Sequence, residues 1–151
     1  MRPHTLNEII PYLQVAIGPV ILISGVGLLL LTMTNRLGRV IDRSRTLAKE
    51  SATIASDKQA ALYEQVAILY RRAKLLRLAI ALASGSALLA GFLIITLFAG
   101  ALMEIKVVLA VELMFSGSLL SLIGSLIVFM LDINLSLHAV TLELKSNKLL
   151  E

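Results

Sequence analysis

The sequence predicts an all-α membrane protein with three transmembrane helices and long cytoplasmic helical extensions that form a bundle. Apolar residues make up 58% of the chain and charged residues only 16%, against about 45–50% and about 25% in an average soluble domain. The apolar residues gather in three blocks without charge, from Ile9 to Asn35, from Leu78 to Met103 and from Leu113 to Leu131. A helix needs about 20 such residues to cross a bilayer, and continuous apolar runs favour helices over the alternating strands of a barrel.

The three blocks predict a single membrane domain over residues 1–151. Its expected spans lie near 10–35, 78–103 and 107–131. The first block should stay in the mature protein, because it is too long for a signal peptide and is followed by arginines without a small-residue cleavage site. The last two spans should form an antiparallel hairpin, since the turn near Glu104 and Lys106 is very short.

The orientation follows from the segment 36–77, which has ten Lys or Arg residues against four Asp or Glu residues. The positive-inside rule places such a segment in the cytoplasm. We therefore expect an external N-terminus, a cytoplasmic helical hairpin over 36–77, an external turn between the last two spans and a cytoplasmic C-terminal helix over 132–151. Residues 51–58 are small and polar, which is typical of the connection inside the hairpin.

Apolar residues continue at helical spacing beyond the spans. After the first span they define one face, with Leu37, Val40, Ile41, Ser44, Leu47 and Ala48. Before the second span they form a heptad seam, which includes Leu62, Val66, Leu69 and Leu76. These faces would bury each other, so the extensions are predicted to continue the transmembrane bundle into the cytoplasm.

Basic residues crowd the ends of the first two spans. They are candidates for a lipid-headgroup or anion site: Arg36, Arg39, Arg43, Arg45, Arg71 and Arg72. A basic side chain near an anionic leaflet contributes about 1 kcal/mol to binding. The alternative is a topology anchor, because such flanks occur in membrane proteins of every function. Asp42 stands three residues from both Arg39 and Arg45, within reach of each on a helix.

The run Asn35-Arg36-Leu37-Gly38-Arg39-Val40-Ile41-Asp42-Arg43-Ser44-Arg45 resembles the end of the first span in a bacterial family of short three-span membrane proteins. Arg71 and Arg72, and the tail segment 133–137, are similar to later motifs of that family. The family is known only as a domain of unknown function, so the resemblance implies three spans and a bacterial inner (plasma) membrane, and no activity.

Polar residues inside the spans are the remaining candidates. Glu112 lies about 9 Å from Lys106 along a helix, where an ionisable group is costly unless it is paired or hydrated. Gln14 should lie at similar depth, which allows a polar cluster or an ion path. The alternative is that the Glu112 carboxylate reaches the outer interface or caps a packing contact. Ser118, Ser121 and Ser125 share one face of the third span. That face would either line a pore or pack against another helix, as small residues do in membranes.

No motif for catalysis, phosphate loops or metal ligation is present, and the chain has no cysteine and two histidines. We therefore expect no enzyme, no metal, no cofactor and no nucleic-acid partner; membrane lipids are the expected partners. Two functions remain open, and the sequence favours the first. The first is a homo-oligomeric assembly with an ion channel or transport role, for which an inorganic cation would be the cargo. The second is a non-transporting scaffold or regulatory subunit that binds a partner or anionic lipid through its cytoplasmic helices.

Overall fold

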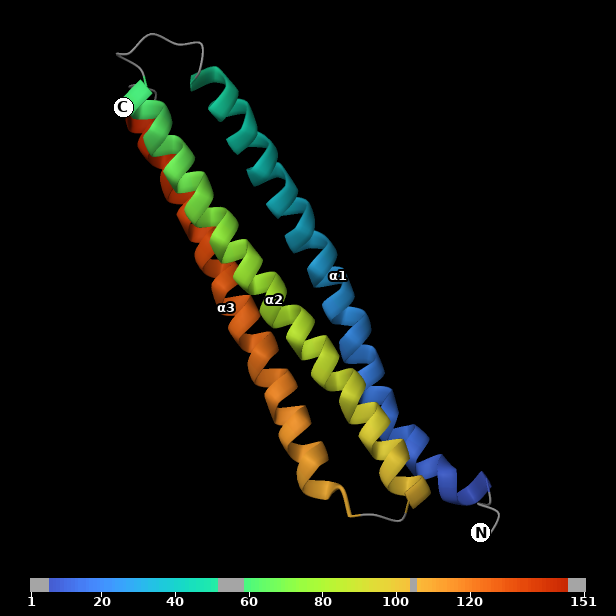
Figure 1. Ribbon diagram of the computed structural model, residues 1–151. Coiled ribbons are helices and arrows are strands. Elements are labelled where there is room, and N and C mark those ends of the chain that lie inside the picture. Colours follow the sequence, from blue (N-terminus) through green and yellow to red (C-terminus); the bar gives the residue numbers. More distant parts are fainter. Residues whose placement is uncertain (1–5, 52–58, 104–105, 147–151) are drawn as a thin grey trace. The chain divides into compact units, whose positions relative to one another are not determined.

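A computed structural model describes residues 6–51, 59–103 and 106–146, and describes side chains for most of them but not beyond residue 136. The described chain forms three α-helices and no strand (Figure 1). They are α1, Leu6–Ser51; α2, Gln59–Met103; and α3, Val108–Ser146. The helices end at the two connections expected from the sequence, on either side of residues 52–58 and of 104–107. The all-α fold is therefore confirmed.

Each helix is long and apolar enough to cross a membrane. The candidate spans lie within Leu13–Lys49, Gln65–Met103 and Val108–Ser136. Only 17%, 28% and 11% of the residues in their most apolar windows are buried inside the protein. Large apolar side chains therefore face outward, as with Ile21 and Leu28 of α1. Such exposure is costly in water and favourable in lipid, so the chain is an integral membrane protein.

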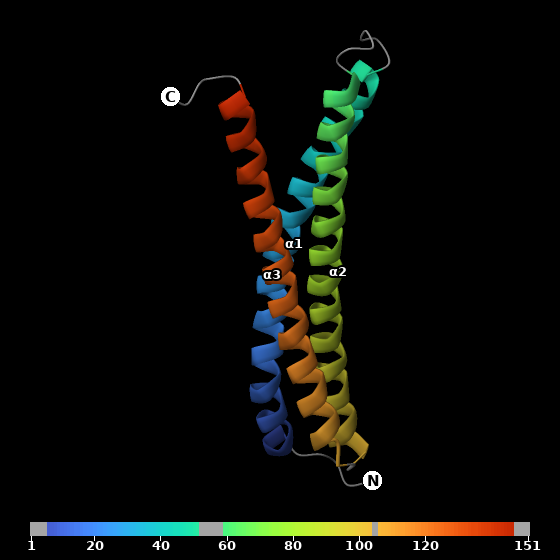
Figure 2. The same cartoon turned by 90° about the vertical axis from the view of Figure 1, so that its left-hand side faces the viewer.

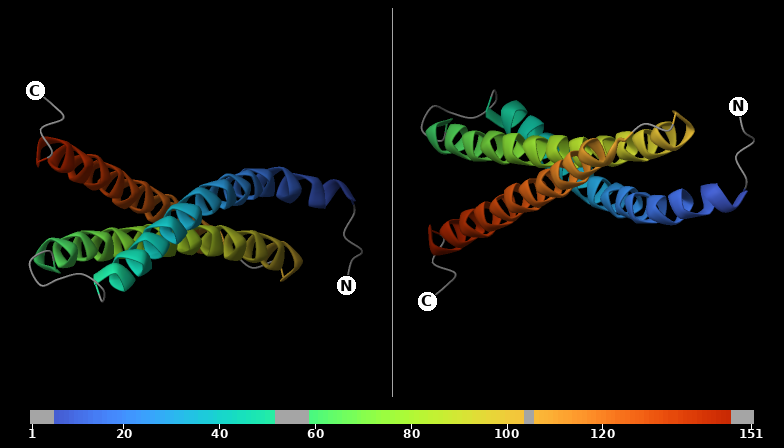
Figure 3. Two further views of the ribbon diagram at one scale, coloured as in Figure 1. Left: turned by 90° about the horizontal axis from the view of Figure 1, so that it is seen from above. Right: turned by 90° about the horizontal axis from the view of Figure 1, so that it is seen from below.

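Contacts divide the chain into two compact units, and each contains part of all three helices. The apolar unit comprises Met1–Leu30 and Ala81–Gly124, and the charged unit comprises Leu31–Ile80 and Ser125–Glu151. Each helix is continuous from one unit into the other, as its unbroken ribbon shows (Figure 3). The single domain expected over residues 1–151 stays a prediction.

In the apolar unit, small residues line the contact between α2 and α3. Ala83, Ser86 and Ala90 of α2 are buried, as is Ser118 of α3. A Cβ atom added at Gly117 would lie 3.4 Å from the Leu89 side chain, so the two helices are already in close contact there. Figure 2 shows these parts of α2 and α3 side by side. Small residues at helix contacts allow backbones to approach, which is the main way in which membrane helices gain packing energy.

The core of the charged unit includes a heptad on α1. Met33, Val40 and Leu47 are buried at seven-residue intervals, and Leu76 of α2 is fully buried. The predicted α1 face was therefore right at Val40 and Leu47 and wrong at Ile41 and Ala48, whose side chains are exposed. A face that repeats every seven residues is narrower than the one predicted. In the predicted α2 seam, Val66 and Leu69 are half-buried, and Leu62 lies outside the described side chains.

Candidate arginine site

The charged unit contains one fully buried acidic residue among its described side chains, Asp132 of α3, and two arginines meet it. Arg72 of α2 donates a hydrogen bond from Nε to Oδ1 at 3.3 Å. Arg36 of α1 forms an ion pair from Nη2 to Oδ2 at 3.5 Å, without a hydrogen bond. Asp132 therefore joins all three helices by charge, each partner coming from a different helix.

Sequence position explains why these three residues meet. Arg36 directly follows the charge-free block of the first helix, and Asp132 directly follows that of the third. Arg72 lies six residues before the block of the second helix, which runs in the opposite direction along the bundle. The arginine side chains are long enough to span the remaining distance along the bundle to Asp132. The Arg36 side chain is only 23% exposed and that of Arg72 only 16%. A buried carboxylate requires such compensation, because an unpaired one would be strongly destabilising.

Arg36 has a further contact that fixes its direction. Its guanidinium carbon lies 5.4 Å from the centre of the Phe129 ring of α3, within the range of a cation–π interaction. Phe129 and Asp132 are three residues apart, so they lie on one face of α3. Arg36 is thus held by both a charge and an aromatic ring of the same helix.

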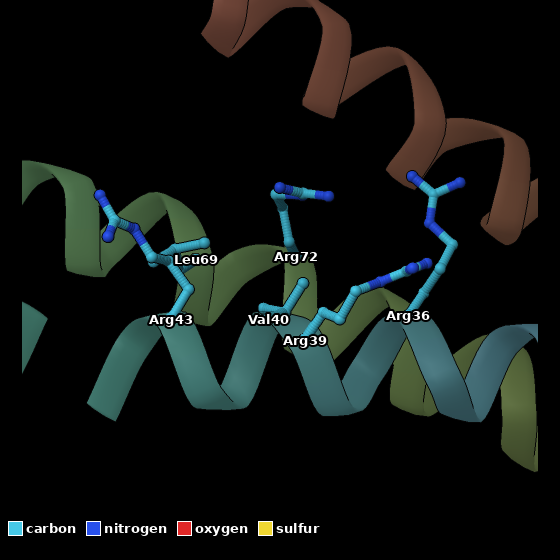
Figure 4. Close-up of a pocket in the computed structure, with 6 residues that line it drawn as sticks. All are labelled: Arg36, Arg39, Val40, Arg43, Leu69 and Arg72. Atoms are coloured by element: carbon cyan, nitrogen blue, oxygen red, sulfur yellow. The ribbon is translucent and has the colours of Figure 1, made fainter. Parts of the chain in front are cut away.

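Beside this ion pair network lies an open pocket of about 280 Å³. We call it the arginine pocket. It is lined by Arg36, Arg39, Val40, Arg43, Leu69 and Arg72. Figure 4 shows four of these residues along α1 and the other two on α2. Among the lining residues that the structure describes, four are positively charged and none is acidic, so the chemistry of the pocket suits an anion with several oxygen acceptors.

The six arginines predicted from the sequence divide into two sets. Arg36, Arg39, Arg43 and Arg72 line the pocket. Arg45 and Arg71 do not line it, and both are exposed. Within the described residues, Asp42 forms no ion pair with Arg39 or Arg45. The sequence prediction therefore named all four charged residues among the described lining of the pocket and missed Asp132, which pairs with two of them.

The three serines predicted as pore or packing residues donate hydrogen bonds to backbone carbonyls of α2. Ser118 and Ser121, in the apolar unit, bond to the carbonyls of Ser86 at 2.9 Å and of Leu82 at 2.7 Å. In the charged unit, Ser125 bonds to the carbonyl of Ala79 at 2.7 Å. These contacts fit the packing interpretation, since the hydroxyls are committed to a helix of the same chain.

The expected polar cluster of Gln14 and Glu112 is not formed by hydrogen bonds or ion pairs among the residues that the structure describes. Both side chains are exposed. Glu112 and Lys106 border a largely apolar pocket at the start of α3, next to Gly100 and Val107. In the described ranges, no three His, Cys, Asp or Glu side chains are grouped so that they could hold a metal ion.

Comparison with known proteins adds a family and no activity. Neither the curated proteins nor the solved structures gave a match. A family model described as a protein of unknown function (DUF2721) matches residues 16–142. That range includes all three helices in large part, the arginine pocket and Asp132, and therefore the chain belongs to the DUF2721 family.

Proposed function

We propose that this integral membrane protein is a non-transporting scaffold or regulatory subunit that binds the phosphate groups of anionic lipids in its arginine pocket. One observation supports the proposal most directly: four arginines from α1 and α2 line a single pocket, in which the other described lining residues are the apolar Val40 and Leu69. Arginine presents five N–H donors in a planar fork that matches phosphate oxygens. Basic pockets between membrane helices are a recurrent form of lipid headgroup site.

The height of the pocket in the bilayer favours a lipid over a soluble anion. Arg36 directly follows the charge-free block of α1, and Arg43 lies seven residues further on. The two positions are therefore about 10 Å apart along the helix axis. The headgroup layer on each side of a bilayer is about 5–8 Å thick, given a total of about 40–45 Å and a hydrocarbon core of about 30 Å. The arginine pocket therefore begins at the hydrocarbon border and covers the depth at which lipid phosphates lie.

The orientation proposed from the positive-inside rule agrees with this ligand. It would place the arginine pocket at the cytoplasmic face of a bacterial inner membrane, where basic residues meet anionic lipid. Each correctly placed basic residue adds about 1 kcal/mol of attraction to such a surface. Arginines that converge on one pocket should bind individual lipids more tightly than the same charges scattered over the surface.

Lipid titration with matched arginine variants tests the proposal. The purified chain is placed in bilayer nanodiscs of phosphatidylcholine with or without phosphatidylglycerol, and its resistance to unfolding is measured. Phosphatidylglycerol should stabilise the wild type and should stabilise Arg39→Gln clearly less. Arg45→Gln is the control, because it removes an identical charge from α1 outside the pocket. If Arg39→Gln and Arg45→Gln lose the stabilisation by phosphatidylglycerol to the same extent, the effect is one of general surface charge, and that result would contradict a lipid site.

A homo-oligomeric cation channel is the second candidate, and Glu112 supports it. Its carboxylate is exposed within a candidate span, four residues from the start of α3. Several copies around an axis would bring such carboxylates together and attract cations. Planar bilayer recordings of wild type and Glu112→Gln test this candidate. A cation current that falls in Glu112→Gln would support it, and a wild type without current at any voltage or pH would remove it.

A further inference from the structure

The arginine pocket is longer than one phosphate group requires. Its three α1 arginines follow each other at intervals of three and four residues, over about 10 Å of helix. In Figure 4 the Arg43 guanidinium lies on one side of Val40, and those of Arg39 and Arg36 lie on the other. Because these guanidinium groups point apart, the row offers two separate places at which an anionic group could accept charge-assisted hydrogen bonds.

The floor between the two ends is apolar. Val40 is buried and Leu69 is half-buried, and both line the pocket, with Val40 between Arg43 and Arg39 in the view of Figure 4. A ligand that fills the pocket would therefore place anionic groups at its ends and a short carbon bridge over Val40 and Leu69. In the same view the Arg72 guanidinium lies above Val40 and points toward the end at which Arg39 and Arg36 lie.

Charge balance points to the same kind of ligand. The four arginines together with Asp132 carry a net charge of +3. One phosphodiester would leave two of these positive charges uncompensated, whereas two phosphodiesters leave one. Arg36 and Arg72 are already oriented by Asp132, while Arg39 and Arg43 have no ion pair among the described residues. Arg39 and Arg43 are therefore both available to a ligand, one toward each end of the pocket.

We infer that the arginine pocket selects a lipid with two phosphodiester groups joined by a short bridge, the diphosphatidylglycerol (cardiolipin) class. One phosphate lies with Arg72 and Arg39 on the side held by Asp132, the glycerol bridge lies over Val40 and Leu69, and the second phosphate lies with Arg43. The acyl chains enter the hydrocarbon region beside α1. This inference rests on the proposed lipid-binding function and adds the class of lipid and the role of Arg43 in selectivity.

A charge-matched competition tests the selectivity. The full chain in a mild detergent is titrated with tetraoleoyl cardiolipin or with dioleoyl phosphatidylglycerol, and bound lipid is counted by native mass spectrometry. Two phosphatidylglycerol molecules carry the charge and the acyl chains of one cardiolipin, so equal lipid charge is compared. The wild type should bind one cardiolipin per chain, with an apparent Kd at least about tenfold below that for phosphatidylglycerol, as expected for one additional charge-assisted contact.

Arg43→Gln and Arg45→Gln form the matched pair of variants. Both side chains are exposed on α1, and only Arg43 lines the pocket. Arg43→Gln should reduce the preference for cardiolipin to within about twofold while phosphatidylglycerol binding changes little, and Arg45→Gln should leave the preference intact. If Arg43→Gln and Arg45→Gln change the preference for cardiolipin over phosphatidylglycerol equally, the inference is overturned.

The remaining outcomes separate this inference from the proposed function. If wild type binds both lipids equally at equal charge but Arg39→Gln weakens both, the pocket is a lipid site without selectivity for two phosphates, and the inference fails alone. If Arg39→Gln changes neither Kd, the proposed function fails as well. Inorganic pyrophosphate is the soluble probe: binding to the lipid-free chain as tight as that of cardiolipin would assign the pocket to a soluble phosphate and overturn the lipid.

Discussion

Replacing Asp132 by asparagine should be among the most destabilising single changes in the charged unit. Asp132 is fully buried and faces Arg72 at 3.3 Å and Arg36 at 3.5 Å. Asparagine keeps the size of the side chain but removes the negative charge, so two guanidinium groups would share one site without compensation. Removal of one partner from a buried ion pair costs about 3–5 kcal/mol. We expect Asp132→Asn to lower the free energy of unfolding by that amount.

The assay is unfolding in mixed micelles with a rising mole fraction of sodium dodecyl sulfate, followed by a fluorescence pair on α1 and α3. Asp42→Asn is the matched control, because it makes the same chemical change at an exposed position on α1 without an ion pair to Arg39 or Arg45. The control should change stability by less than about 0.5 kcal/mol. If Asp132→Asn is no more destabilising than Asp42→Asn, the ion pairs described here do not hold the three helices together.

A triple variant separates stability from ligand binding. Arg36→Met, Arg72→Met and Asp132→Leu together remove every charge of the network and fill its space with apolar side chains. Replacing a whole buried ion pair network in this way is often neutral or stabilising. The triple variant should therefore unfold within about 1 kcal/mol of wild type and yet lose most of its affinity for anionic lipid. Loss of both properties would show that the charges themselves are needed for folding.

Three further predictions concern the rest of the chain. Gly100→Ala should destabilise the protein by about 1–3 kcal/mol in a thermal unfolding measurement, because the added Cβ would clash with the stiff side chain of Val107. Gly91→Ala is the control in the same measurement, since its added Cβ meets nothing within 4 Å. Ser125→Ala should cost about 0.6 kcal/mol, the average for a hydrogen bond between membrane helices, when measured by the same unfolding assay. At a fusion point after Asp57, a reporter that works only in the cytoplasm should be active and one that works only in the periplasm should be inactive. Activity of the periplasmic reporter would reverse the proposed orientation.

The helices could be predicted from the sequence because their signal is local. A charge-free block longer than about 20 residues has few alternatives to a membrane helix, and charges mark where each block ends. The acidic residue of the site had such a signal too. Asp132 stands directly after the third block, at the same border as Arg36 after the first. Consecutive spans alternate in direction, so the first and third spans end on the same side of the membrane. Comparing the residues at these two block ends would have paired Asp132 with Arg36.

The faces of the helices could not be predicted in the same way. Arg71 and Arg72 are neighbours of the same type, yet only Arg72 lines the pocket. Adjacent helical residues differ by about 100° around the axis, so the rotation of α2 decides between them. Ser121 presented the same difficulty, because a small polar residue suits both a pore and a helix contact. The hydrogen bond to Leu82 depends on which helix lies opposite, and residue type alone does not encode that.

A buried carboxylate beside the proposed lipid site looks unfavourable at first, since it would repel the anionic ligand that the arginines would attract. Its effect on the arginines explains its presence. Each arginine side chain has about 2 kcal/mol of rotamer entropy to lose when it is fixed, and a ligand that had to order Arg36 and Arg72 would bind more weakly by part of that amount. Asp132 fixes both before a ligand arrives, with Phe129 also holding Arg36. It neutralises one charge of four, so the arginine pocket keeps its positive sign and gains a defined geometry.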